Sequence, residues 1–289
     1  MIKLIVDSTC DINNEITDNY DVDIIPLGIA IGGISYLDGV DIDVDTVYMH
    51  MREGKVPKTS QITYKSVVES IEKCVANNED FIYLSFSSKM SGTYNFAKKI
   101  IDSYKEKYPE RKMEVVDSRG GGGGSALIAV QILKMIEQKI PFEAIVKQVH
   151  FMANHVVYFF TLADLDWLHK GGRVSKPVSY VGDILNIKPF LTVKDGTIVV
   201  SKMVRGSKKV IQTLIKEVYK GTGKFSNQVI AISHADDLKA ALKVEQKIKE
   251  TIKGCRTTIF QIGAVLGTHL GIGGVGVFFF DERPEFYEL

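Results

Sequence analysis

A short apolar run that passes directly into a cluster of hydroxyl side chains constrains this chain more than any other feature. Residues Phe81–Phe86 are rich in aromatic and β-branched side chains, which predicts a buried strand. The hydroxyl-rich segment Ser87–Tyr94 follows, and apolar residues then recur at helical spacing from Phe96 to Tyr104. The stretch therefore predicts a loop between the carboxyl end of a strand and the amino end of a helix, where open α/β sheets bind ligands.

Ser91 and Thr93 are candidate caps of the helix that follows this loop. The free amides of a first helical turn and the positive end of the helix dipole attract an anion such as a carboxylate or a phosphate. The same residues also fit an ordinary helix start without a ligand, so this loop alone does not decide between the two interpretations.

Strand and helix patterns alternate through the first half of the chain. Strands are predicted at residues 2–6 and 113–116, and helices at 126–136 and 142–152. Such alternation implies a mainly parallel sheet with right-handed crossovers. We expect an α/β fold with an N-terminal domain over residues 1–155.

The second half, residues 156–289, predicts a C-terminal α/β domain with a mixed or antiparallel sheet. Asp195-Gly196 between β-rich runs is typical of a hairpin. The remaining predicted strands are 156–162, 198–204, 229–232 and 257–262, and the predicted helices are 165–169, 178–185, 207–219 and 237–252.

Residues 55–64 carry several hydroxyl groups before a helical run, which predicts a second hydroxyl-bearing loop. Residues 24–31 predict one strand, with Pro26 near its start favouring an edge position. Gly32-Gly33 predicts a turn directly after it.

Two glycine-rich segments invite a nucleotide-binding interpretation. Gly120–Gly124 has no lysine after it in a Walker pattern, so we predict a flexible, mobile turn. Gly271–Gly276 matches G-x-G-x-x-G, but a β-type run follows it instead of a helix. We therefore expect the second segment to pack closely against other parts of the chain.

Composition excludes several function classes. The 36 basic and 35 acidic residues nearly balance, so nothing indicates nucleic acid or an anionic membrane surface as a partner. Three dispersed cysteines favour reduced thiols and a cytoplasmic location, and the apolar start is too short for a signal or a membrane span. We expect no metal, cofactor or catalytic residue, because no hydrolase elbow or histidine ligand spacing is present.

Three cations crowd the start of the helix predicted at 207–219: Arg205, Lys208 and Lys209. Ser207 is the expected cap. Cations at this end oppose the helix dipole, so the cluster favours an anionic partner surface or a transferring phosphate over local stability. A solvated basic turn remains the alternative.

Several short motifs together resemble the DegV family of fatty-acid-binding proteins, which includes the binding subunits of bacterial fatty acid kinase. The resemblance covers nearly the whole chain and rests on Asp7-Ser8-Thr9, Thr59-Ser60-Gln61, Ser87-Ser88 with Ser91-Gly92-Thr93-Tyr94, Val116-Asp117-Ser118, Lys170-Gly171-Gly172-Arg173-Val174-Ser175, Ile187-Lys188-Pro189 and His269.

This resemblance implies a carrier that is not an enzyme alone. It would hold a long-chain fatty acid in an apolar tunnel and present the carboxylate to a separate cytosolic kinase subunit, which makes an acyl phosphate for phospholipid synthesis. It places Thr59, Ser60, Ser91, the Gly92 amide and His269 on the carboxylate, and Arg205 on the kinase-facing surface with Lys208 and Lys209 beside it. Transient contact with a membrane or an acyltransferase would follow from such a role.

A different class of protein remains as the alternative. A small-metabolite kinase or phosphatase would use the glycine-rich loops, although the sequence shows no nucleophile, metal set or phosphate-binding lysine motif for it.

Overall fold

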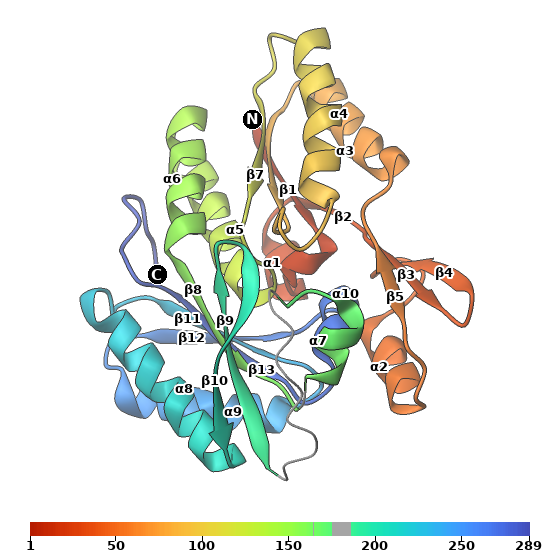
Figure 1. Cartoon of the computed structure of the whole chain (residues 1–289). Coiled ribbons are helices and arrows are strands. Elements are labelled where there is room, and N and C mark those ends of the chain that lie inside the picture. Colours follow the sequence, from red (N-terminus) through yellow and green to blue (C-terminus); the bar gives the residue numbers. More distant parts are fainter. Residues whose placement is uncertain (164, 175–185) are drawn as a thin grey trace.

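A computed structural model describes residues 1–163, 165–174 and 186–289 (Figure 1). The helix predicted at 178–185 lies outside the described residues. The described chain forms three sheets with helices between and around them, an α/β fold as predicted. None of its helices combines the length and apolar character that a membrane span requires.

The first sheet is fully parallel, in the order β2 (Val22–Ile25), β1 (Ile2–Asp7), β6 (Asp80–Ser85) and β7 (Met113–Asp117). Alternate side chains of its strands enter two different cores. Helices α3 (Tyr64–Ala76) and α4 (Thr93–Lys107) cover one face. Helices α5 (Gly122–Glu137) and α6 (Phe142–His155) cover the other.

The second sheet is mixed, as expected for the second half of the chain. Its order is β10 (Thr197–Arg205), β9 (Ile187–Lys194), β8 (Val156–Thr161), β13 (Val275–Phe280), β11 (Val229–His234) and β12 (Arg256–Gln261). Only β11 and β12 pair in parallel among these described strands. The Asp195-Gly196 hairpin is present, with positive φ at both residues.

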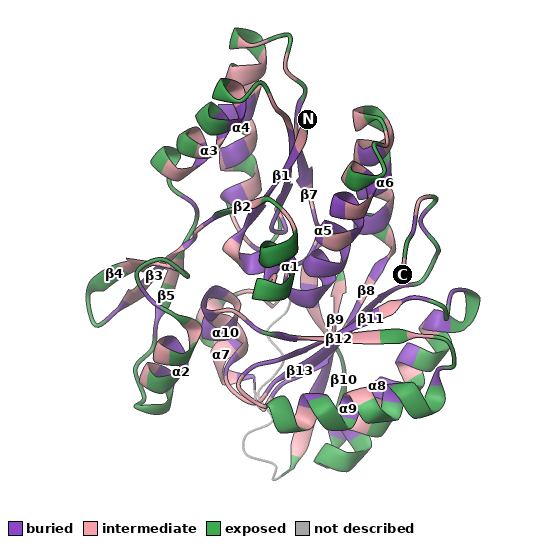
Figure 2. Cartoon of the chain, turned by 180° about the vertical axis from the view of Figure 1, so that it is seen from behind, coloured by how far each residue is buried: buried purple, intermediate pink, exposed green. Residues whose placement is uncertain are grey.

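Helix α5 lies between the two sheets, and its side chains join one core with residues of both. Helices α8 (Ser207–Gly221) and α9 (Leu238–Thr251) pack on the far face of the second sheet. Figure 2 shows the contrast, with α5 almost wholly buried and the outer surfaces of α8 and α9 exposed. We propose that the domain boundary lies where α6 passes directly into β8, at residues 155 and 156.

The prediction of one strand over residues 24–31 is wrong. Strand β2 ends at Ile25, and β3 (Gly28–Ile31) belongs to a separate antiparallel sheet with β4 (Ile34–Leu37) and β5 (Lys58–Ser60). Pro26 lacks an amide hydrogen and so cannot continue a ladder of hydrogen bonds at the point where the chain changes sheets. Part of the predicted hydroxyl loop, Lys58–Ser60, is likewise a strand.

The remaining helices are η1 (Ser8–Cys10), α1 (Asn14–Asn19), α2 (Val44–Arg52), α7 (Asp166–Gly171), η2 (Thr222–Lys224) and α10 (Ala264–Leu270). Helices α7 and α10 lie side by side between the small sheet and the second sheet (Figure 1). This arrangement brings α10 against strand β5.

The expectation of a flexible turn at Gly120–Gly124 is wrong. The last three glycines begin α5, and all five lie against other side chains. A Cβ atom at Gly121 would lie 2.6 Å from the Phe86 ring, and one at Gly124 would lie 2.3 Å from the Tyr158 ring. The glycines are there because two ring systems approach the backbone closely, and this packing orders the segment.

We expect Gly124→Ala to lower the free energy of unfolding by about 1 to 3 kcal/mol, because the added methyl overpacks a buried tyrosine. Urea denaturation measures the change. Gly223→Ala is the matched control, since its Cβ would meet no atom within 4 Å, and it should change stability by less than about 0.5 kcal/mol. Equal stability of the two variants would mean that the glycine segment is loosely packed after all.

Candidate functional site

A cavity of about 230 Å³ lies where the small sheet, the loop before α4, helix α10 and the second sheet meet. Its walls are mainly apolar and come from segments far apart in the sequence. They include Leu27, Phe86, Met90, Phe160, Leu162, Val193, Ile198, Ile262, Val265, Leu266, Leu270, Val275 and Phe278. A single water needs only about 10 to 15 Å³, so the cavity has room for a much larger molecule.

All five predicted carboxylate-binding residues line this cavity: Thr59, Ser60, Ser91, Gly92 and His269. They come from strand β5, from the loop before α4 and from helix α10. Ser60 and Gly92 are exposed, so the polar end of the cavity opens to the surface. The structure therefore gathers the predicted polar residues at a mouth.

Backbone pairing positions the two hydroxyls of β5. Thr59 pairs with Ile29, and Ser60 pairs with Gly28, on the neighbouring strand β3. A Cβ at Gly28 would lie 2.2 Å from Ser60 Oγ, so glycine is required for this approach. These hydroxyls thus project from a paired strand, where the sequence predicted a loop.

The prediction that Ser91 or Thr93 caps α4 is wrong: Gly92 occupies the cap position, Ser91 precedes it and Thr93 is the first helical residue. Ser91 Oγ accepts a hydrogen bond from the Thr93 amide at 3.2 Å and lies 2.9 Å from Thr93 Oγ1. This bond still fixes the Ser91 side chain beside the amino end of the helix. Gly92 lets Gln61 approach, since a Cβ there would lie 2.3 Å from Gln61 Oε1.

His269 contacts Thr59 directly. Its Nε2 lies 2.7 Å from Thr59 Oγ1, while its Nδ1 faces Gly171 and has no partner among the described residues. Burial, assisted by the nearby Arg173 cation, lowers the pKa of His269 to about 4. The imidazole is therefore neutral at pH 7 and adds no charge to the site.

Arg173 supplies the positive charge of the site, a role that the sequence analysis did not assign. Its Nε donates to the Met90 carbonyl at 3.3 Å, and its guanidinium also donates to the Gly171 carbonyl. No carboxylate lies within ion-pair distance of it in residues 1–163, 165–174 and 186–289. The basic turn Lys170–Val174 was the available signal, but its spacing gave no indication that Arg173 would turn toward the cavity.

The three predicted partner-contact cations lie elsewhere. Arg205 ends β10, and Lys208 and Lys209 lie in the first turn of α8; all three are exposed. None of them lines the cavity. The predicted Ser207 cap is wrong: Gly206, with φ of 93°, occupies the cap position, and Ser207 is the first helical residue.

The arrangement suits an amphipathic anion. One end offers a guanidinium that has no carboxylate partner among the described residues, together with hydroxyl donors, and the other walls offer apolar surface. Within the described residues, no group of three or more His, Cys, Asp or Glu side chains is placed to hold a metal ion. The site as described is thus equipped for binding, with donors in place for a carboxylate.

Comparisons with known proteins show what the chain and its fold are similar to. A DegV domain-containing protein of Caldanaerobacter subterraneus is 33% identical over 282 residues, covering 96% of this chain and 98% of the relative. The crystal structure of a stearic acid-binding protein from Eubacterium ventriosum is similar with a TM-score of 0.89 and 26% identity, covering 96% and 97% of the two chains. The fold of fatty acid kinase B3 from Streptococcus pneumoniae, loaded with linoleic acid, is also similar, with a TM-score of 0.86, 24% identity and coverage of 97% and 99%.

A family model described as an uncharacterised protein of the DegV family matches residues 1–282. That match spans the first sheet, the cavity and the whole of the second sheet. The chain therefore belongs to the DegV family.

Proposed function

We propose that this protein binds a long-chain fatty acid in the cavity, with the carboxylate at the mouth and the tail among the apolar walls. The observation that carries the proposal is the Arg173 guanidinium, which faces the cavity mouth without a carboxylate partner among the described residues. The related protein of Eubacterium ventriosum, described as stearic acid-binding, supports the same ligand class.

Burial of the tail drives binding. Each buried methylene contributes roughly 0.8 kcal/mol, so a chain of about 16 carbons gains on the order of 10 kcal/mol before ordering costs are subtracted. The carboxylate then needs donors in place of water. Arg173, Ser91, Ser60, the Gly92 amide and Thr59 can supply them.

His269 acts through Thr59 in this proposal. With neutral Nε2–H donating to Thr59 Oγ1 across 2.7 Å, the threonine hydroxyl hydrogen is free to point at the carboxylate. A protonated imidazole would place a second cation beside Arg173, which the buried position opposes. The bound state then pairs one anion with one cation.

The finer role is that of a carrier, without catalysis of its own, that presents the carboxylate to a separate kinase subunit for acyl phosphate formation. The open polar mouth supports this, because a carboxylate bound there stays reachable. The exposed cations Arg205, Lys208 and Lys209 offer a surface for an anionic partner. The free cysteines support a cytoplasmic location, with transient contact to a membrane or an acyltransferase during delivery.

The small-metabolite kinase or phosphatase gains no support. Glycines of both glycine-rich segments lie against aromatic rings, Gly124 against Tyr158 and Gly271 against Trp167. Such packing differs from the open cradle of backbone amides that binds phosphate.

We expect Arg173→Gln to weaken binding of hexadecanoic acid by about tenfold or more, because a hydrogen bond to a charged group contributes about 1.5 to 3 kcal/mol. Binding of hexadecanol should change little, and calorimetric titration of delipidated protein measures both. Arg283→Gln, a change of an exposed arginine outside the cavity, is the control. Equal binding of acid and alcohol to the wild type would contradict a carboxylate site.

The pKa of His269 predicts a pH dependence of stability. Between pH 6.5 and about 4 the unfolded chain takes up a proton on this side chain that the folded protein refuses, so the free energy of unfolding decreases as the pH falls. The full effect is about 3 kcal/mol. Denaturation of the wild type and of His269→Gln at several pH values isolates the contribution of His269 to stability. Buried Asp38, whose pKa burial raises to about 6, makes a contribution of the opposite sign, but it does so in both proteins and cancels in their difference. A wild-type minus variant difference that does not depend on pH would exclude a neutral buried imidazole.

We expect Arg205→Ala to keep fatty acid binding but to lose acyl phosphate formation with the cognate kinase. The exposed side chain lies outside the cavity, so only the encounter with the kinase should suffer. Arg283→Ala controls for removal of one surface cation. Unchanged turnover would refute the assignment of Arg205, whereas loss of lipid binding would place Arg205 at the ligand.

A further inference from the structure

Helices α8 and α9 carry a concentration of positive charge that the overall balance of the chain conceals. Together they contain eight lysines and three glutamates. Each glutamate already forms an ion pair: Glu217 with Lys202, Glu245 with Lys249 and Glu250 with Lys247. Apart from Lys220, which also pairs with Glu217, the remaining lysines of the two helices have no carboxylate partner among the described residues: Lys208, Lys209, Lys216, Lys239 and Lys243.

A groove of about 930 Å³ runs between these two helices. Its floor is apolar, with Ile211, Ile215 and Ala240 at least half-buried, and the Tyr219 ring is 57% exposed within it. Asp237 is the one carboxylate that lines it among the described residues, and its Oδ1 accepts a hydrogen bond from the Ala240 amide at 3.0 Å as the cap of α9. Lysines without a carboxylate partner line both sides, from α8 Lys208 and Lys216 and from α9 Lys239 and Lys243.

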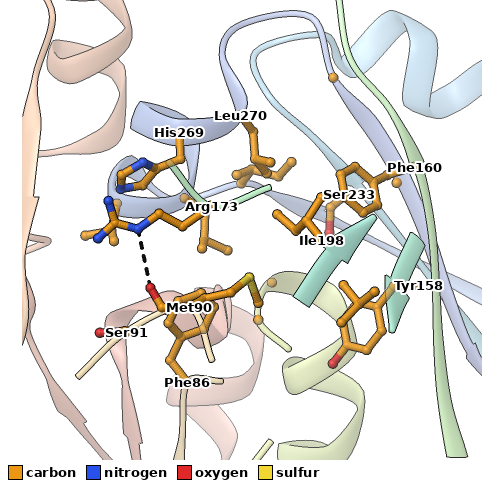
Figure 3. A pocket seen from close by; sticks show the side chains of 18 of the residues that line it. Phe86, Met90, Ser91, Tyr158, Phe160, Arg173, Ile198, Ser233, His269 and Leu270 are labelled. Atoms are coloured by element: carbon orange, nitrogen blue, oxygen red, sulfur yellow. Dashed lines mark hydrogen bonds between the residues drawn. The ribbon is translucent and has the colours of Figure 1, made fainter. Parts of the chain in front are cut away.

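The groove and the cavity lie on opposite faces of the second sheet. Phe159 and Phe160 are neighbours on β8, so their side chains point to opposite faces. Phe159 packs into the core beneath α8 and α9, whereas Phe160 lines the cavity. Figure 3 shows Phe160 and Ile198 beside the cavity, on strands of this sheet. A ligand in the cavity therefore leaves the groove uncovered.

The shape and place of the groove favour a protein partner over a lipid surface. A bilayer in contact with α8 and α9 would lie on the far side of the second sheet from the cavity. A groove between two helices instead matches the ridge of side chains on a third helix. An amphipathic helix lays its apolar face into such a groove, and its polar flanks meet the edges. Acidic flanks would give the lysines the carboxylates that they lack within the described chain.

We infer that an amphipathic helix of a partner protein, with acidic side chains along both edges of its apolar face, docks in the groove between α8 and α9. The inference deepens the proposed partner surface at Arg205, Lys208 and Lys209, and rests on it. The apolar face of the docked helix covers Tyr219, and its carboxylates pair with lysines of α8 on one side and of α9 on the other. Such a partner holds the protein by a surface that leaves the cavity mouth open.

Charge reversal on both sides of the groove tests the docking, with the cognate kinase as the probe. Lys216→Glu/Lys243→Glu should bind the kinase at least about tenfold more weakly than the wild type, because two attractive contacts become repulsive. Lys99→Glu/Lys147→Glu makes the same change of net charge at exposed positions of α4 and α6 outside the groove. Interferometry with lipid-loaded protein measures both affinities. Equal affinity of the two variants would overturn the inference.

Removal of one ring tests whether the partner buries an apolar face. Tyr219→Ala should weaken kinase binding about tenfold at low and at high salt, because apolar burial is not screened by ions. Leu242→Ala is the control, since Leu242 is 49% exposed on α9 and does not line the groove. If the two variants bind the kinase equally well, no apolar face enters the groove and the inference is overturned.

A photoreactive benzoylphenylalanine in place of Gln212, which is exposed in the groove, identifies the occupant. Mass spectrometry should find it joined to an acidic amphipathic helix of the kinase. Joining only to a second copy of this chain would overturn the inference, as would a charge-reversal variant that loses binding to phosphatidylglycerol vesicles but keeps the kinase.

The same samples separate this inference from the proposed ligand. If the wild type binds hexadecanoic acid but no kinase, the docked helix is refuted while fatty acid binding stands. If hexadecanoic acid does not bind, the proposed ligand fails, and the comparison of the groove variants in unloaded protein still decides the docking.

Discussion

The buried carboxylate of Asp7 holds together the part of the fold on which the cavity depends. It lies at the end of the central strand β1 and accepts hydrogen bonds from the Phe86 amide at 2.8 Å, from Tyr83 at 3.2 Å and from both the amide and the hydroxyl of Thr9. Burial raises its pKa, and these donors offset part of the rise. Phe86 lines the cavity, so one carboxylate connects the first sheet to the candidate site.

Local patterns in the sequence predicted those elements that depend on short-range features of the chain. The strand before Ser87, the helix after it and the Asp195-Gly196 hairpin all follow from side-chain periodicity and turn chemistry. The split at Pro26 did not, because a proline shows only where a ladder stops and cannot show that the next strand joins another sheet. The prediction for the glycine segment was wrong for a similar reason, because the rings that order it come from distant parts of the chain, from β8 and from the loop after β6.

Local motifs also predicted part of the candidate site. Its five predicted residues, four with polar side chains and Gly92 with its amide, come from motifs that are specific in combination, and all five line one cavity. The role of Arg173 was missed because isolated arginines are common, and only the folded chain shows which of them face a cavity. Whether the five bind a carboxylate stays a prediction.

Strand order within the second sheet has a consequence for synthesis. β13 lies between β8 and β11 in the middle of that sheet, yet the ribosome makes it after every one of its described sheet partners. Until β13 has been made, β8 and β11 lack the strand that lies between them. His269 likewise reaches Thr59, 210 positions away in the sequence, only after α10 has been made. Such distant pairings form slowly. Under the proposed fatty acid binding, a nascent chain cannot hold the ligand before α10 and β13 have emerged, and loading therefore follows translation.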